Sequence, residues 1–198
     1  MRVTVDSSGG PLPDQIDVLP PERMRELNAA LGDRLSSDIR DHFRVLEGRG
    51  NRHGWTPREH FWADQLRATQ LASSDASGAV VNVGDRRYPI HYFGGTVEPV
   101  EARYLTIPVH ERAYRRRASV LNEALVAGGH SRLFRPRRRG GGRANVLVSA
   151  NPEGELTAYY ALAESADIPA DPDAWPSDDL LQEGLDETTE DFLSIVLR

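Results

Sequence analysis

Hydrophobic residues recur at helical spacing in one long stretch near the start of the chain. From Pro21 to Leu46 an apolar side chain appears every three or four residues, the spacing that places such side chains along one face of an α-helix. Proline at the first position and Gly48 just beyond the last apolar residue are the usual ends of a helix. The pattern predicts an amphipathic helix of roughly seven turns. Its buried face is expected to hold Met24, Leu27, Leu31, Leu35, Ile39 and Phe43.

A second helix is expected after the glycine-containing stretch 48–55. Thr56, Pro57 and Glu59 match an N-cap, a first-turn proline and the acid of a capping box. We expect this helix to continue to about Ala72 and to carry four side chains on one face. These are Phe61, Trp62, Leu66 and Thr69.

Alternating and β-branched residues in the middle of the chain predict antiparallel strands. Gly84-Asp85 is expected to join the first two strands, and Pro89 places the second one at an edge or a bulge. A turn at 151–154 joins the last two, which form the clearest hairpin in the sequence, and a short helix is expected at 111–117. The extended segments are 79–83, 87–93, 104–109, 144–149 and 155–163.

The two ends of the chain differ in pattern from its middle. Residues 1–20 contain many turn formers without a period, which predicts a flexible arm with a short edge strand at 2–5. Residues 166–198 begin with a proline-spaced connector, and Ser177 is expected to cap an acidic C-terminal helix. The expected inner face of that helix holds Leu181, Leu185, Thr188, Phe192 and Ile195.

The order of these elements predicts an α+β fold. Two N-terminal helices and a C-terminal helix are expected to pack on a mainly antiparallel sheet, with extended arms and loops. We expect three segments: a flexible arm at 1–20, an α+β domain at 21–165, and the connector with the acidic helix at 166–198.

Charge is divided unequally along the chain. All 24 basic residues are arginine, and the net charge is −6. Residues 112–143 hold ten arginines against Glu123 alone, whereas residues 151–198 hold thirteen acids against Arg198 alone. The protein therefore carries a segment of charge +9 and a segment of charge −12.

Few residues suggest catalysis or a cofactor. The absence of cysteine excludes disulfides and thiolate zinc sites. His53, His60, His91 and His110 match no metal-ligand spacing, no serine lies in a GxSxG elbow, and the glycine pairs match no phosphate-binding loop. No run of 18 apolar residues and no export signal are present. We expect no enzymatic activity, no cofactor and no membrane partner.

An arginine-rich run stands out at 135–143. Guanidinium groups on a glycine-rich loop form an electrostatic footprint for phosphates. The acidic chain, the absence of a helix-turn-helix pattern and the lack of interleaved aromatic residues favour a solvated loop or a salt-bridging arm. A DNA contact remains the alternative. The run contains Arg135, Arg137, Arg138, Arg139 and Arg143.

Several motifs in residues 49–117 together resemble a known family. Trp55, Phe61 and Trp62 approach and enter a helix, and two further motifs follow. These are Tyr92-Phe93-Gly94-Gly95-Thr96 and Ala102-Arg103-Tyr104-Leu105-Thr106-Ile107-Pro108, after which Ala113 and Tyr114 begin a short helix. The combination resembles the phage virion-morphogenesis family of tail-completion proteins, to which the G protein of phage Mu and the S protein of phage P2 are related.

The resemblance implies a structural role in tail completion or head-tail joining. The protein would be a component of a virion or similar particle, assembled in the cytoplasm of a bacterial host. Its implied partners are tail-tube and neck or connector proteins, and further copies of itself in a ring whose tail symmetry suggests a hexamer. The residues expected to make these contacts are Tyr92, Phe93, Gly94, Gly95, Tyr104, Pro108, Arg135, Arg137, Arg138, Arg139 and Arg143.

Three other interpretations stay open at this point. The first is a nucleic-acid-binding module that uses residues 135–143, and the second is a hydrolase or nuclease built on His53, His91 and nearby acids. The third is a soluble α+β domain whose likeness to the family is accidental.

Overall fold

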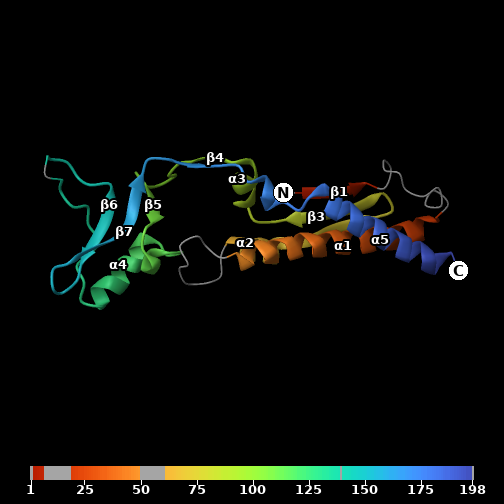
Figure 1. Ribbon diagram of the computed structural model, residues 1–198, viewed down its shortest axis with the longest axis horizontal. Helices are drawn as coiled ribbons and strands as arrows, with labels where there is room; N and C mark the ends of the chain where they lie inside the picture. The colour runs from red at the N-terminus through yellow and green to blue at the C-terminus, as the bar shows by residue number, and fades with distance from the viewer. Residues whose placement is uncertain (1, 7–18, 50–60, 139, 198) are drawn as a thin grey trace. The chain divides into compact units, whose positions relative to one another are not determined.

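A computed structural model describes residues 2–6, 19–49, 61–138 and 140–197. The chain divides into two compact units. Unit 1 comprises Met1–Gly50, Glu59–Gly94 and Pro169–Arg198, and unit 2 comprises Asn51–Arg58 and Gly95–Ile168. Helices and antiparallel sheets make up both units (Figure 1), and this confirms the predicted α+β class.

Unit 1 is built around two helices that lie side by side, α1 (Pro21–Gly48) and α5 (Asp178–Val196). The apolar stripe of α1 is buried as predicted from Leu27 to Phe43, and Leu35, Ile39 and Phe43 pack against the inner face of a sheet. Met24, at the start of the expected face, is only half-buried. The Ser177 side chain accepts a hydrogen bond from the Leu180 backbone N–H at 3.3 Å, so the predicted cap of α5 is confirmed.

The sheet of unit 1 has the strand order β1-β3-β2, with β1 (Arg2–Asp6), β2 (Thr69–Asp75) and β3 (Gly78–Val83). The expected edge strand at 2–5 is confirmed. Helix α2 (Phe61–Ala68) ends earlier than expected, and the extension to Ala72 is wrong. Instead Thr69 begins β2, and the Asp75 carboxylate accepts the Ser77 N–H at 2.8 Å in a tight turn that returns the chain into β3. The expected cap at Thr56, Pro57 and Glu59 lies outside the described residues.

The expected strand at 87–93 is wrong, because Tyr88–Phe93 forms helix α3. Pro89 stands in the first turn of that helix, where a missing N–H costs nothing. Before it, Asp85 accepts a hydrogen bond from the Arg87 N–H at 2.8 Å. Tyr88 and Tyr92 then lie one turn apart with stacked rings 6.2 Å apart, and the Tyr88 hydroxyl donates to the Ala174 carbonyl in η3 (Pro172–Ala174) at 3.1 Å.

Unit 2 holds a sheet of order β5-β7-β6, with β5 (Leu105–Pro108), β6 (Val146–Ala150) and β7 (Leu156–Ala163). The predicted hairpin and the strand within 104–109 are confirmed. A separate pair joins β4 (Gly95–Val97) to β8 (Ala166–Ile168). The expectation of one sheet is therefore corrected, because the described strands form three sheets.

A helix that the sequence pattern did not predict, α4 (Ala118–Ala127), packs on the sheet formed by β5, β7 and β6. The short helix expected at 111–117 is reduced to one 3-10 turn, η2 (Glu111–Ala113). None of the helices in the described part of the chain is long and apolar enough to cross a membrane.

Candidate interaction surface

Helix α4 covers one face of the sheet in unit 2. Leu121 and Leu125 of α4 pack with Tyr159 and Tyr160 of β7. The strand register shifts between Leu147 and Val148, and this bulge lets two consecutive tyrosines join the same cluster. The Tyr160 hydroxyl donates to the Arg116 carbonyl at 2.9 Å, and burial raises the pKa of Tyr160. This face is a closed core.

The opposite face of the same sheet is apolar throughout. Residues directly opposite one another in antiparallel strands point to the same side. Ile107 lies opposite Ala161, which lies opposite Val146, so these three form one row across the sheet. We call the whole set the apolar face. It consists of Leu105, Ile107, Phe134, Val146, Val148, Ala150, Leu156, Ala158, Ala161 and Ala163.

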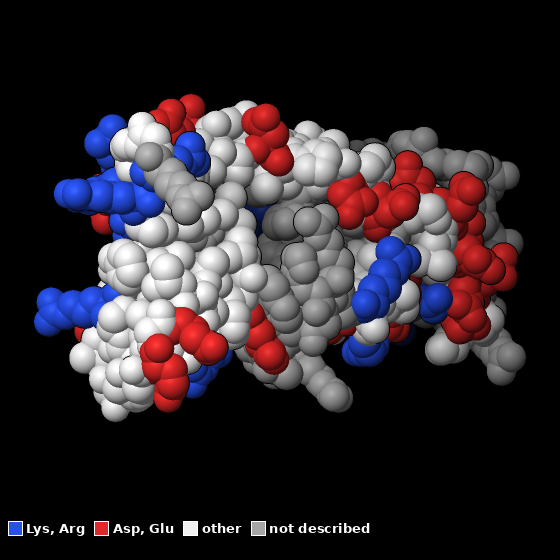
Figure 2. All heavy atoms as spheres, turned by 60° about the vertical axis from the view of Figure 1, so that its left-hand side comes forward, with Lys and Arg blue, Asp and Glu red and all other residues white. Residues whose placement is uncertain are grey.

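Much of the apolar face is open. Ile107 and Phe134 each remain 40% exposed, and Leu156 remains 59% exposed. Single exposed apolar side chains are common in proteins, but a contiguous exposed set marks an interaction site. Figure 2 shows a broad area of unit 2 that carries no charged groups. Arginine side chains stand at the outer margin of that area. The arrangement suits a protein surface better than a small ligand.

One end of the apolar face is basic. The Tyr104 ring has the Arg103 guanidinium 5.4 Å from its centroid and the Arg135 guanidinium 4.8 Å from it. Arg135 is held in place, because its Nε donates to the Ala144 carbonyl at 2.9 Å and its Nη2 to the Asn145 Oδ1 at 3.0 Å. Such cation–π and hydrogen-bond contacts fix a guanidinium before any partner arrives.

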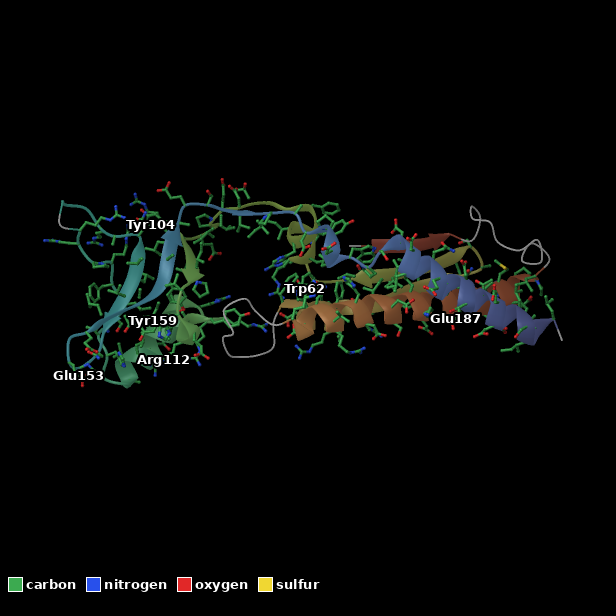
Figure 3. All side chains as sticks on the ribbon, viewed as in Figure 1. Trp62, Tyr104, Arg112, Glu153, Tyr159 and Glu187 are labelled. Atoms are coloured by element: carbon green, nitrogen blue, oxygen red, sulfur yellow. The ribbon has the colours of Figure 1, made fainter. Side chains whose placement is uncertain are left out.

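The other end of the sheet is acidic, because the turn between β6 and β7 carries Glu153 and Glu155. Tyr104 and Glu153 mark these two ends in Figure 3. A partner surface that covers the apolar face therefore meets positive charge at one end and negative charge at the other.

The described residues of the arginine-rich run form a hairpin at the basic end. We call residues 134–148 the arginine hairpin: Phe134 is bridged to Val148, and Arg137 to Arg143. The Arg138 N–H donates to the Gly142 carbonyl at 3.1 Å. Gly141 and Gly142 have φ values of 89° and 76° at the tip, a conformation that favours glycine. Arg137, Arg138 and Arg143 are exposed, and Arg139 lies outside the described residues.

Two of the aromatic residues expected to make contacts, Tyr92 and Phe93, lie on α3 in unit 1. Tyr92 is half-buried against Tyr88, whose pKa is raised by burial. Phe93 is 68% exposed and meets the Tyr92 ring edge-on at 4.8 Å. Gly94 follows with φ 70° and ends the helix.

His91 of α3 is packed rather than exposed to a cleft. Its ring centroid lies 4.0 Å from that of Phe61, and burial, assisted by the positive charge of Arg87, lowers its pKa. His53 and His60 lie outside the described residues. Among the residues that are described, no group of three or more histidine, aspartate or glutamate side chains is placed to hold a metal ion.

The expected contact residues fall into two groups. Tyr92, Phe93 and Gly94 belong to unit 1, whereas Gly95, Tyr104 and the arginines belong to unit 2. The structure brings Tyr104 and Arg135 together, and it turns Pro108 towards the covered face, opposite Tyr160.

The apolar face itself was not predicted. Its signal in the sequence is that 146–150 and 156–163 are apolar at nearly every position, a pattern typical of strands covered on both faces. Only one of those covers, α4, is present in the described part of unit 2.

Comparisons of the chain with models of known protein families, with curated proteins and with solved structures found no match.

Proposed function

We propose that this chain is a non-enzymatic structural protein of a tailed-phage-type particle that acts in tail completion or head-tail joining. The observation that carries the proposal is the apolar face of unit 2, with Ile107, Phe134 and Leu156 exposed. A protein that works alone in water gains nothing from such a face, whereas an assembly protein buries it on docking. The resemblance of residues 49–117 to the virion-morphogenesis family supplies the class of particle.

The partner on the apolar face is a tail-tube, neck or connector protein with an apolar patch and an acidic margin. Charge complementarity supports this choice, because Arg103 and Arg135 lie beside the Tyr104 ring at one end of the face and hydrogen bonds hold Arg135 in place. Opposite charges at the rim steer the encounter and set the register, and the buried apolar area supplies most of the affinity. In this account the protein is a particle component, and the host cytoplasm is only where it assembles.

The test is complementation in a particle-producing host whose copy of the gene has been deleted. Electron microscopy is expected to show unjoined heads and tails, and the wild-type gene to restore complete particles. Ile107→Glu places a charge on the apolar face and is expected to fail. Thr106→Glu is the matched control, since Thr106 is an exposed neighbour that points to the other side of the same strand. Complete particles from the deletion strain, or from Ile107→Glu, would contradict the proposal.

A second candidate function rests on the exposed Arg137, Arg138 and Arg143 side chains at the tip of the arginine hairpin. A nucleic-acid-binding module would hold a short DNA duplex with an affinity that falls with salt, by a logarithmic slope of about 0.9 per phosphate contacted. Fluorescence anisotropy with labelled duplex at two salt concentrations separates the two functions. We expect no binding that survives about 0.15 M salt.

A further inference from the structure

A groove runs between α1 and α5 in unit 1. Its volume is about 550 Å³, and it continues into a second hollow of about 540 Å³. The two share His42, Arg49 and Leu180. Val45 and Leu180 are 62% and 49% exposed there and supply apolar surface. We call the two hollows together the α1–α5 groove.

The groove is acidic. Six carboxylates and two guanidiniums line it, so its net charge is −4 with His42 neutral. One of the guanidiniums, on Arg34, is already neutralised, because it lies 3.0 Å from Asp38 and 2.9 Å from Glu187. The lining carboxylates are those of Asp38, Asp41, Asp173, Asp178, Glu183 and Glu187.

Three of these acids are available to a partner. Asp173, Asp178 and Glu183 are exposed, and none of them has an ion-pair partner among the described residues. Figure 2 shows how strongly acidic side chains gather on unit 1. Glu187 of α5, which pairs with Arg34 of α1 in the groove lining, is labelled in Figure 3.

Aromatic and proline side chains line the end of the groove where η3 meets α5. Tyr92 and Trp175 are half-buried there beside Pro172 and Pro176. An arginine guanidinium can contact the aromatic rings and the carboxylates of the groove at the same time. Its flat face stacks on an aromatic ring while its N–H groups donate to a carboxylate. The apolar stem of an arginine suits exposed aliphatic surface such as Val45 and Leu180.

We propose that the arginine hairpin of a second copy of this chain docks in the α1–α5 groove. The choice of a second copy follows from the charges, since the same molecule carries the acidic groove and a hairpin tip with Arg137, Arg138 and Arg143 exposed. The inference deepens the proposed assembly function and rests on it.

The contact joins unlike surfaces, so it is heterologous. Each copy offers its hairpin to one neighbour and its groove to another, and such a chain of contacts closes into a ring where the rotation between copies allows it. The side chains that dock are Arg137, Arg138 and Arg143 at the hairpin tip, and none of them belongs to the apolar face. The apolar face is left to the tail-tube, neck or connector partner.

The experiment uses charge reversal in the full chain, with assembly measured by native mass spectrometry and light scattering over a range of protein concentrations. The hairpin variant is Arg137→Glu with Arg138→Glu, and the groove variant is Asp173→Arg with Glu183→Arg. Each alone is expected to weaken self-association roughly 10- to 100-fold, because reversal replaces attraction by repulsion at close range. The two variants mixed, or all four changes in one chain, are expected to restore association.

Matched controls carry the same change of charge outside the contact. The control for the hairpin variant is Arg112→Glu with Arg116→Glu, which lie outside the hairpin. The control for the groove variant is Glu190→Arg with Asp191→Arg, which lie on α5 but do not line the groove. Both controls are expected to associate as the wild type does, within about a factor of three.

Rescue by mixing requires contact between molecules, so an effect confined to one chain cannot produce it. A monomer at every concentration, a failure of the mixture to associate, or hairpin and groove variants that associate like the wild type would overturn the inference. Loss of DNA binding as the sole effect of the hairpin variant would also overturn it. Failure of this inference is distinguishable from failure of the proposed function, because Ile107→Glu tests particle assembly through the apolar face alone.

Discussion

Phe43 is the side chain whose removal tests the core of unit 1 most sharply. It is fully buried on α1, and its ring lies 5.7 Å from the Trp62 ring, stacked, and 5.6 Å from the Tyr88 ring, edge-on. Phe→Ala changes in cores cost about 3–5 kcal/mol, and each aromatic pair adds about 0.5–1.5 kcal/mol beyond its buried area. We therefore expect Phe43→Ala to lower the free energy of unfolding by about 4–5 kcal/mol.

That loss is a large part of the 5–15 kcal/mol typical of a folded domain. Urea denaturation followed by tryptophan fluorescence measures it, since Trp62 and Trp175 both belong to the cluster around Phe43. Val45→Ala is the control, because Val45 is 62% exposed on the same helix, and it should cost no more than about 0.5 kcal/mol. A loss below about 1.5 kcal/mol for Phe43→Ala, or equal losses for the two variants, would refute the assignment of the buried face.

Three further predictions concern unit 1. Hydrogen bonds from Arg87 lower the pKa of Asp85 to about 2. About 1–2 kcal/mol of stability is therefore present above pH 4 and is lost as the pH falls towards 2. The Asp85→Asn variant should not show this loss of stability when it is titrated with acid. Burial lowers the pKa of His91 below 6.5, so stability should fall as the pH drops below 6.5, and a thermal melt of His91→Gln at pH 5.5 and 7.5 should show a smaller difference than the wild type. Gly32→Ala should lower the melting temperature by several degrees, because the new Cβ would lie 2.5 Å from Leu71 Cδ1 and 2.9 Å from Ala79 Cβ, whereas Gly48→Ala, with nothing within 4 Å, should not.

Local sequence patterns predicted the long elements well. The apolar residues from Leu27 to Leu46 form the buried face of α1, and the hairpin of β6 and β7 forms where its turn residues indicate. In both cases the period of the apolar residues and the residues at the ends give the same answer, and consistent local signals are the ones that tertiary structure preserves.

The errors arose where local preference was weak and long-range packing decided. The aromatic residues of 88–93 favour a strand on propensity, but Asp85 and Pro89 begin a helix and Tyr88 is drawn into the core. Thr69–Asp75 has few strand formers and becomes β2 only through its pairing with β3.

The candidate surface could be predicted only in part. Tyr104 and Arg135 were both expected contact residues, but their sequence separation gave no hint that they stack together. The apolar face and the acidic groove each draw on segments far apart in the chain, and the register of one strand against another decides which side chains share a face. Such surfaces become visible only once the strands and helices are placed.

The most direct test of the central claim is to determine whether the protein is part of the assembled particle, and at which position. Particles purified from the producing host carry an affinity-tagged copy of this chain, and gold-labelled antibody against the tag is viewed by electron microscopy. The account predicts label at the end of the tail or at the head-tail junction of wild-type particles, and no label when the tagged copy carries Ile107→Glu. Tagged wild-type protein that stays in the soluble host fraction while complete, unlabelled particles form would contradict it.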